Sequence, residues 1–257
     1  MKRVVVISDT HCGHMVGLTP PGWQSLSGSL EKFGEMQKAV WNFYSSWMEK
    51  LQPIDLLIVN GDCIEGKGER SGGTELIEAD RGEQVKMSVR CIEDARAEKI
   101  VIVYGTPYHT GATEDFENQV ADGVRAWKIG GHEWIDVNGV IFDCKHFIGS
   151  SSVPHARHTA PARDGLWNKL WSIDDQQPRA DYIIRSHVHY YTVQGDKDFT
   201  AFTTPAFQGY GSKYGIRKCS GRVDIGFMWF DISEEGRVSW DKKILEIELL
   251  KAEALKL

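Results

Sequence analysis

Aspartate and histidine residues recur at similar places in this 257-residue sequence, each just after a short apolar run. In chain order, the groups are Asp9 with His11, Gly61–Asp62, Gly105 to His109, His146, and His187 with His189. Carboxylate oxygens and imidazole nitrogens suit Zn, Mn, Fe and similar divalent cations. The residue types therefore favour a metal site assembled from distant parts of the chain.

The spacing within these groups supports a shared site. In an extended stretch, residues i and i+2 point to the same side of the chain. Asp9 and His11 can therefore share one metal, and His187 and His189 can face the same cavity. A carboxylate can bridge two metals, and Asp62 is the natural residue for that bridge. Two metals roughly 3.5–4 Å apart are the arrangement used for in-line displacement at phosphorus.

The apolar runs before the groups predict the elements that must position them. Runs rich in β-branched residues indicate buried strands. They are Val4–Ile7, Ile54–Val59, Ile100–Tyr104, Val140–Asp143 and Tyr182–Ile184. Helical spacing at Glu35 to Leu51 and Gly82 to Ala97 lies between the early runs, which predicts βαβ units and a largely parallel sheet. Ligands bind outside the carboxyl ends of strands in such sheets, where the Asp and His groups are expected.

Beyond about residue 130 the sequence becomes mostly strand-like. The stretches are His132–Val137, Val140–Phe147, Tyr190–Gln194, Phe199–Thr204, Val223–Ile232 and Arg237–Ile247. Asn138-Gly139 is typical of a two-residue hairpin turn. The second half therefore predicts a mixed or antiparallel sheet built onto the first. Because no linker-like composition divides the chain, we expect one domain over residues 1–257.

The order of the Asp and His groups resembles that of a known family. D-x-H, G-D, a Gly…His element, a lone His and H-x-H, in this order over residues 9 to 189, are similar to the motifs of the calcineurin-like metallophosphoesterase superfamily. The resemblance implies an α/β fold, a four-layered α/β/β/α sandwich with mixed sheets. It also implies a dinuclear metal centre and hydrolysis of phosphate esters.

The resemblance further implies a role for each matching residue. Asp9, His11 and His189 would hold the first metal, Asp62 would bridge, and His146 and His187 would hold the second. His109 would lie over the leaving group, so that Asp62 and His109 are the expected catalytic residues.

The sequence departs from the family pattern after the third run. The family usually has Gly-Asn-His, whose Asn binds the second metal, whereas this chain reads Gly105-Thr106-Pro107-Tyr108-His109. The Thr106 hydroxyl is the substitute ligand that we expect, with water as the alternative. Ser186 replaces the usual glycine before His187, and Glu65 fits the acid that commonly follows the G-D motif.

These residues predict a metal-dependent phosphoesterase acting on phosphodiester or phosphomonoester bonds. A hydroxide activated by two metals would attack phosphorus, and His109 would assist the leaving group. We expect two divalent ions, Mn first, with Fe, Zn or Ni as alternatives. Two other functions stay open. One is a DNA nuclease of the double-strand-break repair kind, and the other is a non-catalytic metal-binding or protein-binding module on the same fold.

The charge of the chain limits its expected partners. Thirty Lys and Arg against thirty-six Asp and Glu give a net charge of −6, which disfavours extended contact with nucleic acid. Residues 210–222 are nevertheless basic, with Lys213, Arg217, Lys218 and Arg222 and no acid. A nucleic-acid substrate contacting residues 210–222 and a solvated glycine-rich loop are both consistent with this composition.

The five cysteines are odd in number and include no CxxC pair, which excludes a disulfide framework and a structural zinc finger. No apolar stretch approaches the roughly eighteen residues of a membrane span. The run Val4–Ile7 is too short for a signal-peptide core. We therefore expect a soluble, cytoplasmic protein with no membrane contact, and the sequence leaves its oligomeric state open.

Several other residues have ordinary structural explanations. His132 is expected to be a surface or hydrogen-bonded histidine, and Trp167 and Trp171, four apart on a helix, are expected to pack. The stretch Gly13 to Gly34 lacks periodicity and is the expected mobile loop near the site.

Three further histidines have loops that follow the ligand groups closely, so they could line the rim of the cavity. They are His14, His155 and His158.

Overall fold

The β-branched runs of the first half form a sheet whose two faces are both buried, as near-continuous apolar strands require. In this computed structural model, which describes residues 1–25, 31–111, 115–209, 223–247 and 254–256, the sheet has the strand order β11-β10-β1-β2-β3-β4. The parallel strands are β1 (Lys2–Ile7), β2 (Leu56–Asn60), β3 (Lys99–Val103) and β4 (Lys128–Gly130). The strands β10 (Ile225–Ile232) and β11 (Val238–Leu245) extend this sheet by antiparallel pairing.

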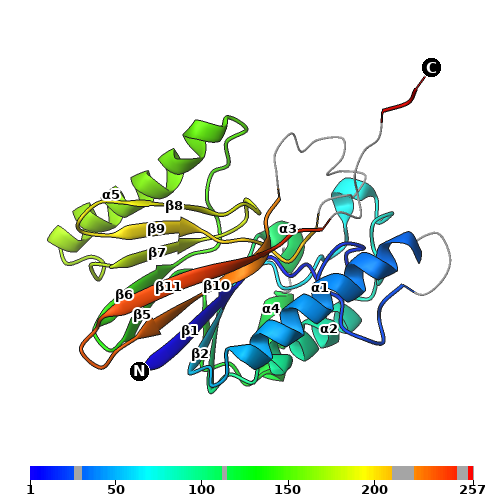
Figure 1. The fold of residues 1–257 in the computed structure, drawn as a ribbon, viewed down its shortest axis with the longest axis horizontal. Helices are drawn as coiled ribbons and strands as arrows, with labels where there is room; N and C mark the ends of the chain where they lie inside the picture. Colours follow the sequence, from blue (N-terminus) through cyan, green and yellow to red (C-terminus); the bar gives the residue numbers. More distant parts are fainter. Residues whose placement is uncertain (26–30, 112–114, 210–222, 248–253, 257) are drawn as a thin grey trace.

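Helices cover the outer face of this first sheet (Figure 1). They are α1 (Glu31–Lys50), α2 (Arg81–Asp94) and α4 (Phe116–Gly123). Asp80 begins α2 by accepting hydrogen bonds from the backbone N–H groups of Gly82 and Glu83, which satisfies donors that a helix start leaves open. The shorter helical pieces are α3 (Pro107–Thr110) and the 3-10 helices Glu69–Ser71 and Pro154–His158.

The second half forms a separate five-stranded sheet of order β5-β6-β7-β9-β8. Its strands are β5 (Glu133–Val137), β6 (Val140–Cys144), β7 (Tyr182–Arg185), β8 (Thr192–Gly195) and β9 (Thr200–Thr203). Asn138 and Gly139, with φ of 53° and 83°, form the β5–β6 hairpin turn that the sequence predicts. The strands β6, β7 and β9 run parallel, so the sheet is mixed.

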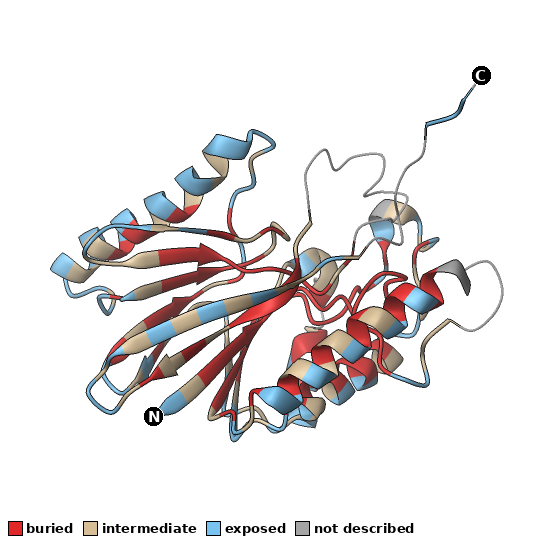
Figure 2. Ribbon diagram, viewed as in Figure 1, coloured by how far each residue is buried: buried red, intermediate tan, exposed pale blue. Residues whose placement is uncertain are grey.

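The two sheets pack face to face because the side chains of β1 alternate between two cores. Val5 and Ile7 pack toward the helices, whereas Val4 and Val6 share a cluster with Phe142 of the second sheet. Figure 2 shows buried residues along the strands of both sheets. Helix α5 (Thr159–Ile173) covers the far face of the second sheet. The layers are therefore α/β/β/α with mixed sheets, as predicted.

The structure differs from expectation in the pairing of the last strands. We expected the strand-like second half to form one sheet built onto the first. Instead β10 and β11 return to the first sheet, where β10 pairs with β1. The reason is burial, since Phe227 packs toward the helices while Met228 and Phe230 fill the space between the sheets.

Two local expectations also differ from the structure. Within the stretch Gly13 to Gly34, expected to be a mobile loop, residues 13–20 are buried, and backbone hydrogen bonds from Met15 to Glu75 and from Leu18 to Thr10 fix them. Residues 26–30 of that stretch lie outside the described residues. Trp167 and Trp171 of α5 are partly exposed instead of packed. Within the described ranges, no helix combines the length and apolarity needed to cross a membrane.

Candidate metal centre

The carboxyl ends of strands from both sheets bring the Asp and His groups together. Asp9 and His11 follow β1, Asp62 follows β2, and His109 lies in α3 after β3. From the second sheet, His146 follows β6, and His187 and His189 follow β7. This convergence places ligands from residues 9 to 189 at one edge of the sandwich (Figure 1).

In the described part of the chain, the potential ligand atoms form three overlapping groups, each with its atoms within 4.8 Å of one another. The groups are Asp9–His11–His189, Asp62–His146–His187 and His11–Asp62–His109. The first two are those that the resemblance assigns to the two metals. The third shares His11 with the first and Asp62 with the second, so all three belong to one continuous centre.

Distances within the groups are short. His189 Nε2 lies 3.1 Å from Asp9 Oδ1 and 3.3 Å from His11 Nε2. In the second group, Asp62 Oδ2 lies 3.0 Å from His146 Nε2 and 3.9 Å from His187 Nδ1. His146 Nε2 also lies 3.9 Å from Asp9 Oδ1, which connects the two groups directly.

Hydrogen bonds behind the ligands fix which ring nitrogen carries a proton. His146 Nδ1 donates to the carbonyl of Asn60 over 2.7 Å, and His109 Nδ1 donates to the carbonyl of Glu65 over 2.9 Å. His11 Nδ1 lies 2.9 Å from the carboxylate of Glu65. In the neutral imidazole the proton is then on Nδ1, and the Nε2 lone pair faces the centre. Such outer partners are typical of metal-ligating histidines.

Two buried polar atoms at the centre, Asp9 Oδ1 and His146 Nε2, make no hydrogen bond to any residue that the structure describes. Buried polar groups normally have partners, so such orphans need an explanation. The carboxylate oxygen of Asp9 is an acceptor, and so is Nε2 of the neutral His146 ring with its proton on Nδ1. A cation between the two atoms would satisfy both. The donor set therefore fits divalent metal ions.

The electrostatics point the same way. Burial alone would lower the pKa of His11 and His146, but nearby carboxylates outweigh it and raise the pKa of each to about 10. They are Asp9, Glu65 and Asp62 for His11, and Asp62 and Asp9 for His146. Burial would raise the pKa of Asp9 and Asp62, yet the surrounding histidines hold both carboxyls well below their usual range. The centre therefore attracts positive charge, as protons or as metal ions.

Backbone strain concentrates at the same residues. The non-glycine residues with φ in the left-handed region include Asp9, His11, Asp62, His187 and His189, at 49°, 43°, 51°, 70° and 54°. Such conformations cost of order 1–3 kcal/mol each and cluster at functional sites. These sharp turns point the side chains off the strand ends toward the centre.

Thr106, the expected substitute ligand, contacts Asp62, the carboxylate that is expected to bridge. Its backbone N–H donates to Asp62 Oδ1 over 2.7 Å, and its hydroxyl donates to the same oxygen over 3.2 Å. These bonds orient Asp62.

Sequence reasoning missed the buried residues that hold the loops of the site. Glu117 of α4 accepts hydrogen bonds from the backbone N–H groups of Cys63 and Gly105, over 2.8 and 2.7 Å. Burial and the charge of Asp62 raise the pKa of Glu117 to about 7. Gln84 of α2 similarly bonds the N–H and carbonyl of Gly66. No local motif marks either residue, because each acts on the backbone of a distant loop.

The other sequence candidates lie outside the three groups. His14 is buried, with its Nε2 3.7 Å from Glu75, while His155 and His158 are exposed on the 3-10 helix Pro154–His158. His132 is hydrogen-bonded to Asp143 over 2.8 Å, which agrees with the expectation of a surface or hydrogen-bonded histidine. The basic segment 210–222 lies outside the described residues.

Comparisons with known proteins add little detail. No protein-family model matches the chain, and no curated protein matches it significantly. Among solved structures, Entamoeba histolytica Vps29 complexed with Zn²⁺ is 14% identical, with a TM-score of 0.42 over 94% of this chain and 98% of that chain. A novel archaeal phosphodiesterase is 10% identical, with a TM-score of 0.46 over 95% of this chain and 99% of that chain. Similarity at this level says nothing about the activity of this chain.

The class of the protein follows from its own layers and residues. The four-layered sandwich with mixed sheets is the fold that the motif order implies, and the matching Asp and His residues meet at one edge of it. The chain therefore has the fold of the calcineurin-like metallophosphoesterases and carries His and Asp groups that could hold metal ions.

Proposed function

We propose that this protein is a metal-dependent phosphoesterase that hydrolyses phosphodiester or phosphomonoester bonds. One observation carries the proposal. Two ligand groups, Asp9–His11–His189 and Asp62–His146–His187, adjoin each other across 3.9 Å between Asp9 Oδ1 and His146 Nε2. Two neighbouring sites of this kind suit a pair of divalent ions.

The residues present define what each position would do. Asp9, His11 and His189 would hold one ion, His146 and His187 would hold the other, and Asp62 would contact both. Bound here, two divalent ions would neutralise the charge of a phosphate ester and lower the pKa of a bound water toward neutrality. Imidazole nitrogens and carboxylate oxygens together accept several divalent metals, and we take Mn as the first ion to test, with Fe, Zn or Ni as alternatives.

The protein's own groups would keep this arrangement rigid. The carboxylate of Glu65 fixes the ring of His11, and the carbonyl of Asn60 fixes the ring of His146. The N–H and hydroxyl of Thr106 hold Asp62 in one orientation. Thr106 remains our substitute for the family's asparagine, with its hydroxyl beside the second ion.

His109 is the residue that we place beside the leaving group. Its Nε2 lies 3.9 Å from Asp62 Oδ2, and its ring contacts that of His11 edge to face, with 4.5 Å between centroids. The same position makes a ligand role the alternative, since His109, His11 and Asp62 form the third group.

The variant His109→Asn separates these two roles. If His109 assists the leaving group, the rate falls roughly 10²–10⁴-fold while bound metal stays near the wild-type amount. If His109 is a ligand, the variant loses one metal as well, and our assignment is wrong. Metal analysis and rate assays on the same sample distinguish the outcomes.

The proposal is tested with metal-replete protein and two chromogenic esters. We expect bis-p-nitrophenyl phosphate or p-nitrophenyl phosphate to be hydrolysed with added Mn, at about two metals per chain. Linear DNA at varied salt is the next substrate, because a nuclease would lose DNA affinity steeply as salt rises. About one metal with no hydrolysis of any ester would favour a non-catalytic binding module and refute the proposal.

A further inference from the structure

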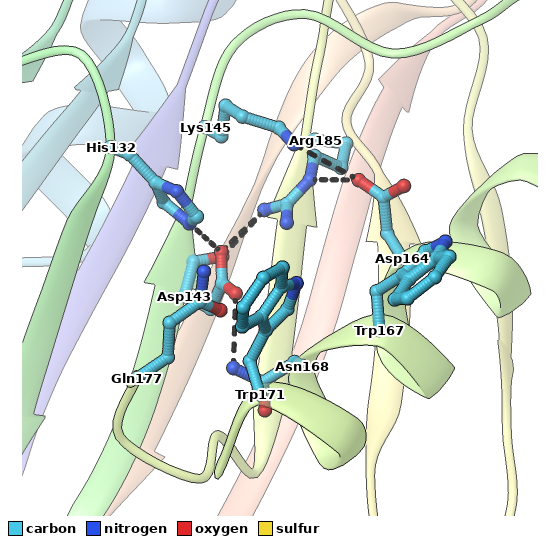
Figure 3. A pocket seen from close by; sticks show the side chains of 9 residues that line it. All are labelled: His132, Asp143, Lys145, Asp164, Trp167, Asn168, Trp171, Gln177 and Arg185. Carbon is cyan, nitrogen blue, oxygen red and sulfur yellow. Dashed lines mark hydrogen bonds and ion pairs between the residues drawn. The ribbon is translucent and has the colours of Figure 1, made fainter. Parts of the chain in front are cut away.

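A cavity of about 330 Å³ lies between α5 and the outer face of the second sheet (Figure 3). Its floor comes from Asp143 of β6, Lys145 directly after β6 and Arg185 of β7, and its wall comes from α5. None of its lining residues belongs to the three ligand groups of the metal centre. The cavity is therefore a separate feature, on the face of the sheet that points away from the first sheet.

The acidic groups of the floor are already engaged. Asp143 takes hydrogen bonds from His132 over 2.8 Å and from Arg185 Nη1 over 2.7 Å. Asp164 takes one from Arg185 Nε over 2.7 Å and lies 3.4 Å from Lys145 Nζ. The carboxylates therefore offer little free accepting capacity to a ligand.

The donors of the floor are not fully used. Arg185 is 2% exposed, and its Nε and Nη1 are hydrogen-bonded, whereas its Nη2 has no partner among the described residues. Figure 3 shows the guanidinium between Asp143 and Asp164, among the side chains that line the cavity. The Gln177 amide, also in the lining, is half-buried and has no hydrogen bond to the described part of the chain. Arg185 Nη2 and the Gln177 amide are therefore free to donate hydrogen bonds to an acceptor that enters the cavity.

The wall of the cavity presents aromatic surface. Trp167 and Trp171 lie one turn apart on α5 and line the cavity, yet they are 52% and 45% exposed. A tryptophan that was merely filling the core would not leave half its surface in water. Exposed indole faces beside a cavity favour stacking with a planar ring.

We propose that this cavity binds a small planar-ring ligand that carries a carbonyl or carboxylate acceptor. The ring stacks on Trp167 or Trp171, and the acceptor receives hydrogen bonds from Arg185 Nη2 and the Lys145 ammonium. The volume is at the lower end of the range for small-molecule sites, which suits a ligand of one or two rings.

The test uses benzoate as the probe and the indole N–H signals of ¹⁵N-labelled full-length protein as the readout. The variants Trp167→Phe and Trp171→Phe assign the two signals. We expect both signals to shift saturably with benzoate and with benzamide. Cyclohexanecarboxylate, which has the same acceptor without a planar ring, should bind roughly 2- to 10-fold more weakly.

Variants at the exposed positions locate the site without threatening the fold. Trp171→Leu should weaken benzoate binding roughly 2- to 10-fold, and Lys145→Gln should weaken benzoate more than benzamide. The control is Trp127→Leu, because Trp127 is exposed but lines no part of this cavity. No saturable shift, or affinity unchanged by Trp167→Leu and Trp171→Leu together, would overturn the proposal. A wild-type dimer that Leu166→Glu dissociates, exposing the two indoles, would also overturn it, since the face would then be an interface.

Discussion

Buried carboxylates and imidazoles face each other at the candidate metal centre. The Nδ1 atoms of His11 and His146, which point away from the centre, are already hydrogen-bonded. Glu65 holds His11 by a contact of 2.9 Å, and the carbonyl of Asn60 holds His146 over 2.7 Å. The order of the motifs predicted the residues that face the centre. It could not predict Glu117 or Gln84, because these side chains act on backbone atoms of loops far away in the sequence.

Replacing Glu65 tests the role of these outer bonds. Glu65→Gln keeps the shape of the side chain but removes the charge that steadies the Nδ1 proton of His11. We expect metal affinity to fall roughly 10- to 100-fold, as measured by competition with a chromogenic chelator. Glu83→Gln, at a partly exposed position in α2, is the matched control. Equal affinities in the two variants would contradict this role.

The metal-free centre should make stability depend on pH in a defined direction. The carboxylates raise the pKa of His11 and His146 to about 10 in the folded chain, against 6.5 for an ordinary histidine. The folded state therefore binds more protons than the unfolded state between these values. This contribution is fully present below pH 6.5 and is lost as pH rises toward about 10. Urea unfolding of chelated protein at a series of pH values measures it, and stability that rises over this range would contradict it.

Glu117 should matter for stability as well as for the site. Its two carboxylate oxygens each accept a backbone N–H, and an amide at this position would present a donor to one of them. We expect Glu117→Gln to lower the free energy of unfolding by about 1–3 kcal/mol. Denaturant unfolding measures the change, with Glu98→Gln on the surface as the control. A stability equal to that of the control would show that the carboxylate is not needed.

At the scale of elements, the runs of β-branched residues predicted β1, β2, β3, β6 and β7 within a residue or two. Buried parallel strands need such runs, so the local sequence is enough to predict their positions. The local sequence does not predict the partner of β10, since β10 pairs with β1 from the other end of the chain. The spacing of Trp167 and Trp171 correctly predicted a helix but not its exposure, which depends on what α5 covers.

The close approach of two loops at the carboxyl ends of β2 and β3 gives a prediction for this scale. A Cβ on Gly105 would lie 2.2 Å from Asp62 Oδ1 and 2.3 Å from Asp62 N. Gly105→Ala should therefore displace Asp62, weaken metal binding and cost about 1–3 kcal/mol of stability. Calorimetric metal titration and thermal unfolding test this. Gly131→Ala is the control, because a Cβ there meets nothing within 4 Å, and equal behaviour of the two variants would refute the prediction.

At the scale of the whole molecule, the candidate metal centre draws its residues from both sheets. Asp9 and Asp62 come from the first sheet, and His146, His187 and His189 come from the second. Ions that bind only the folded state stabilise it by about 2.7 kcal/mol at a concentration 100 times the dissociation constant. We therefore expect Mn to raise the unfolding temperature and a chelator to lower it again. An unfolding temperature that changes with neither Mn nor the chelator would mean that bound metal does not link the two sheets.

The most direct test of the proposed dinuclear centre compares the wild-type chain with Asp62→Asn. Asp62 belongs to the group proposed for the second ion and shares the third group with His11 of the first, so its loss should affect both ions at once. The control is Asp175→Asn, an exposed position whose φ of 52° asparagine tolerates. Bound Mn and hydrolysis of bis-p-nitrophenyl phosphate are measured on the same samples. The account predicts about two ions per chain with turnover in the wild type and the control, and loss of nearly all turnover with weakened binding of both ions in Asp62→Asn. Unchanged turnover in a folded Asp62→Asn protein would contradict it.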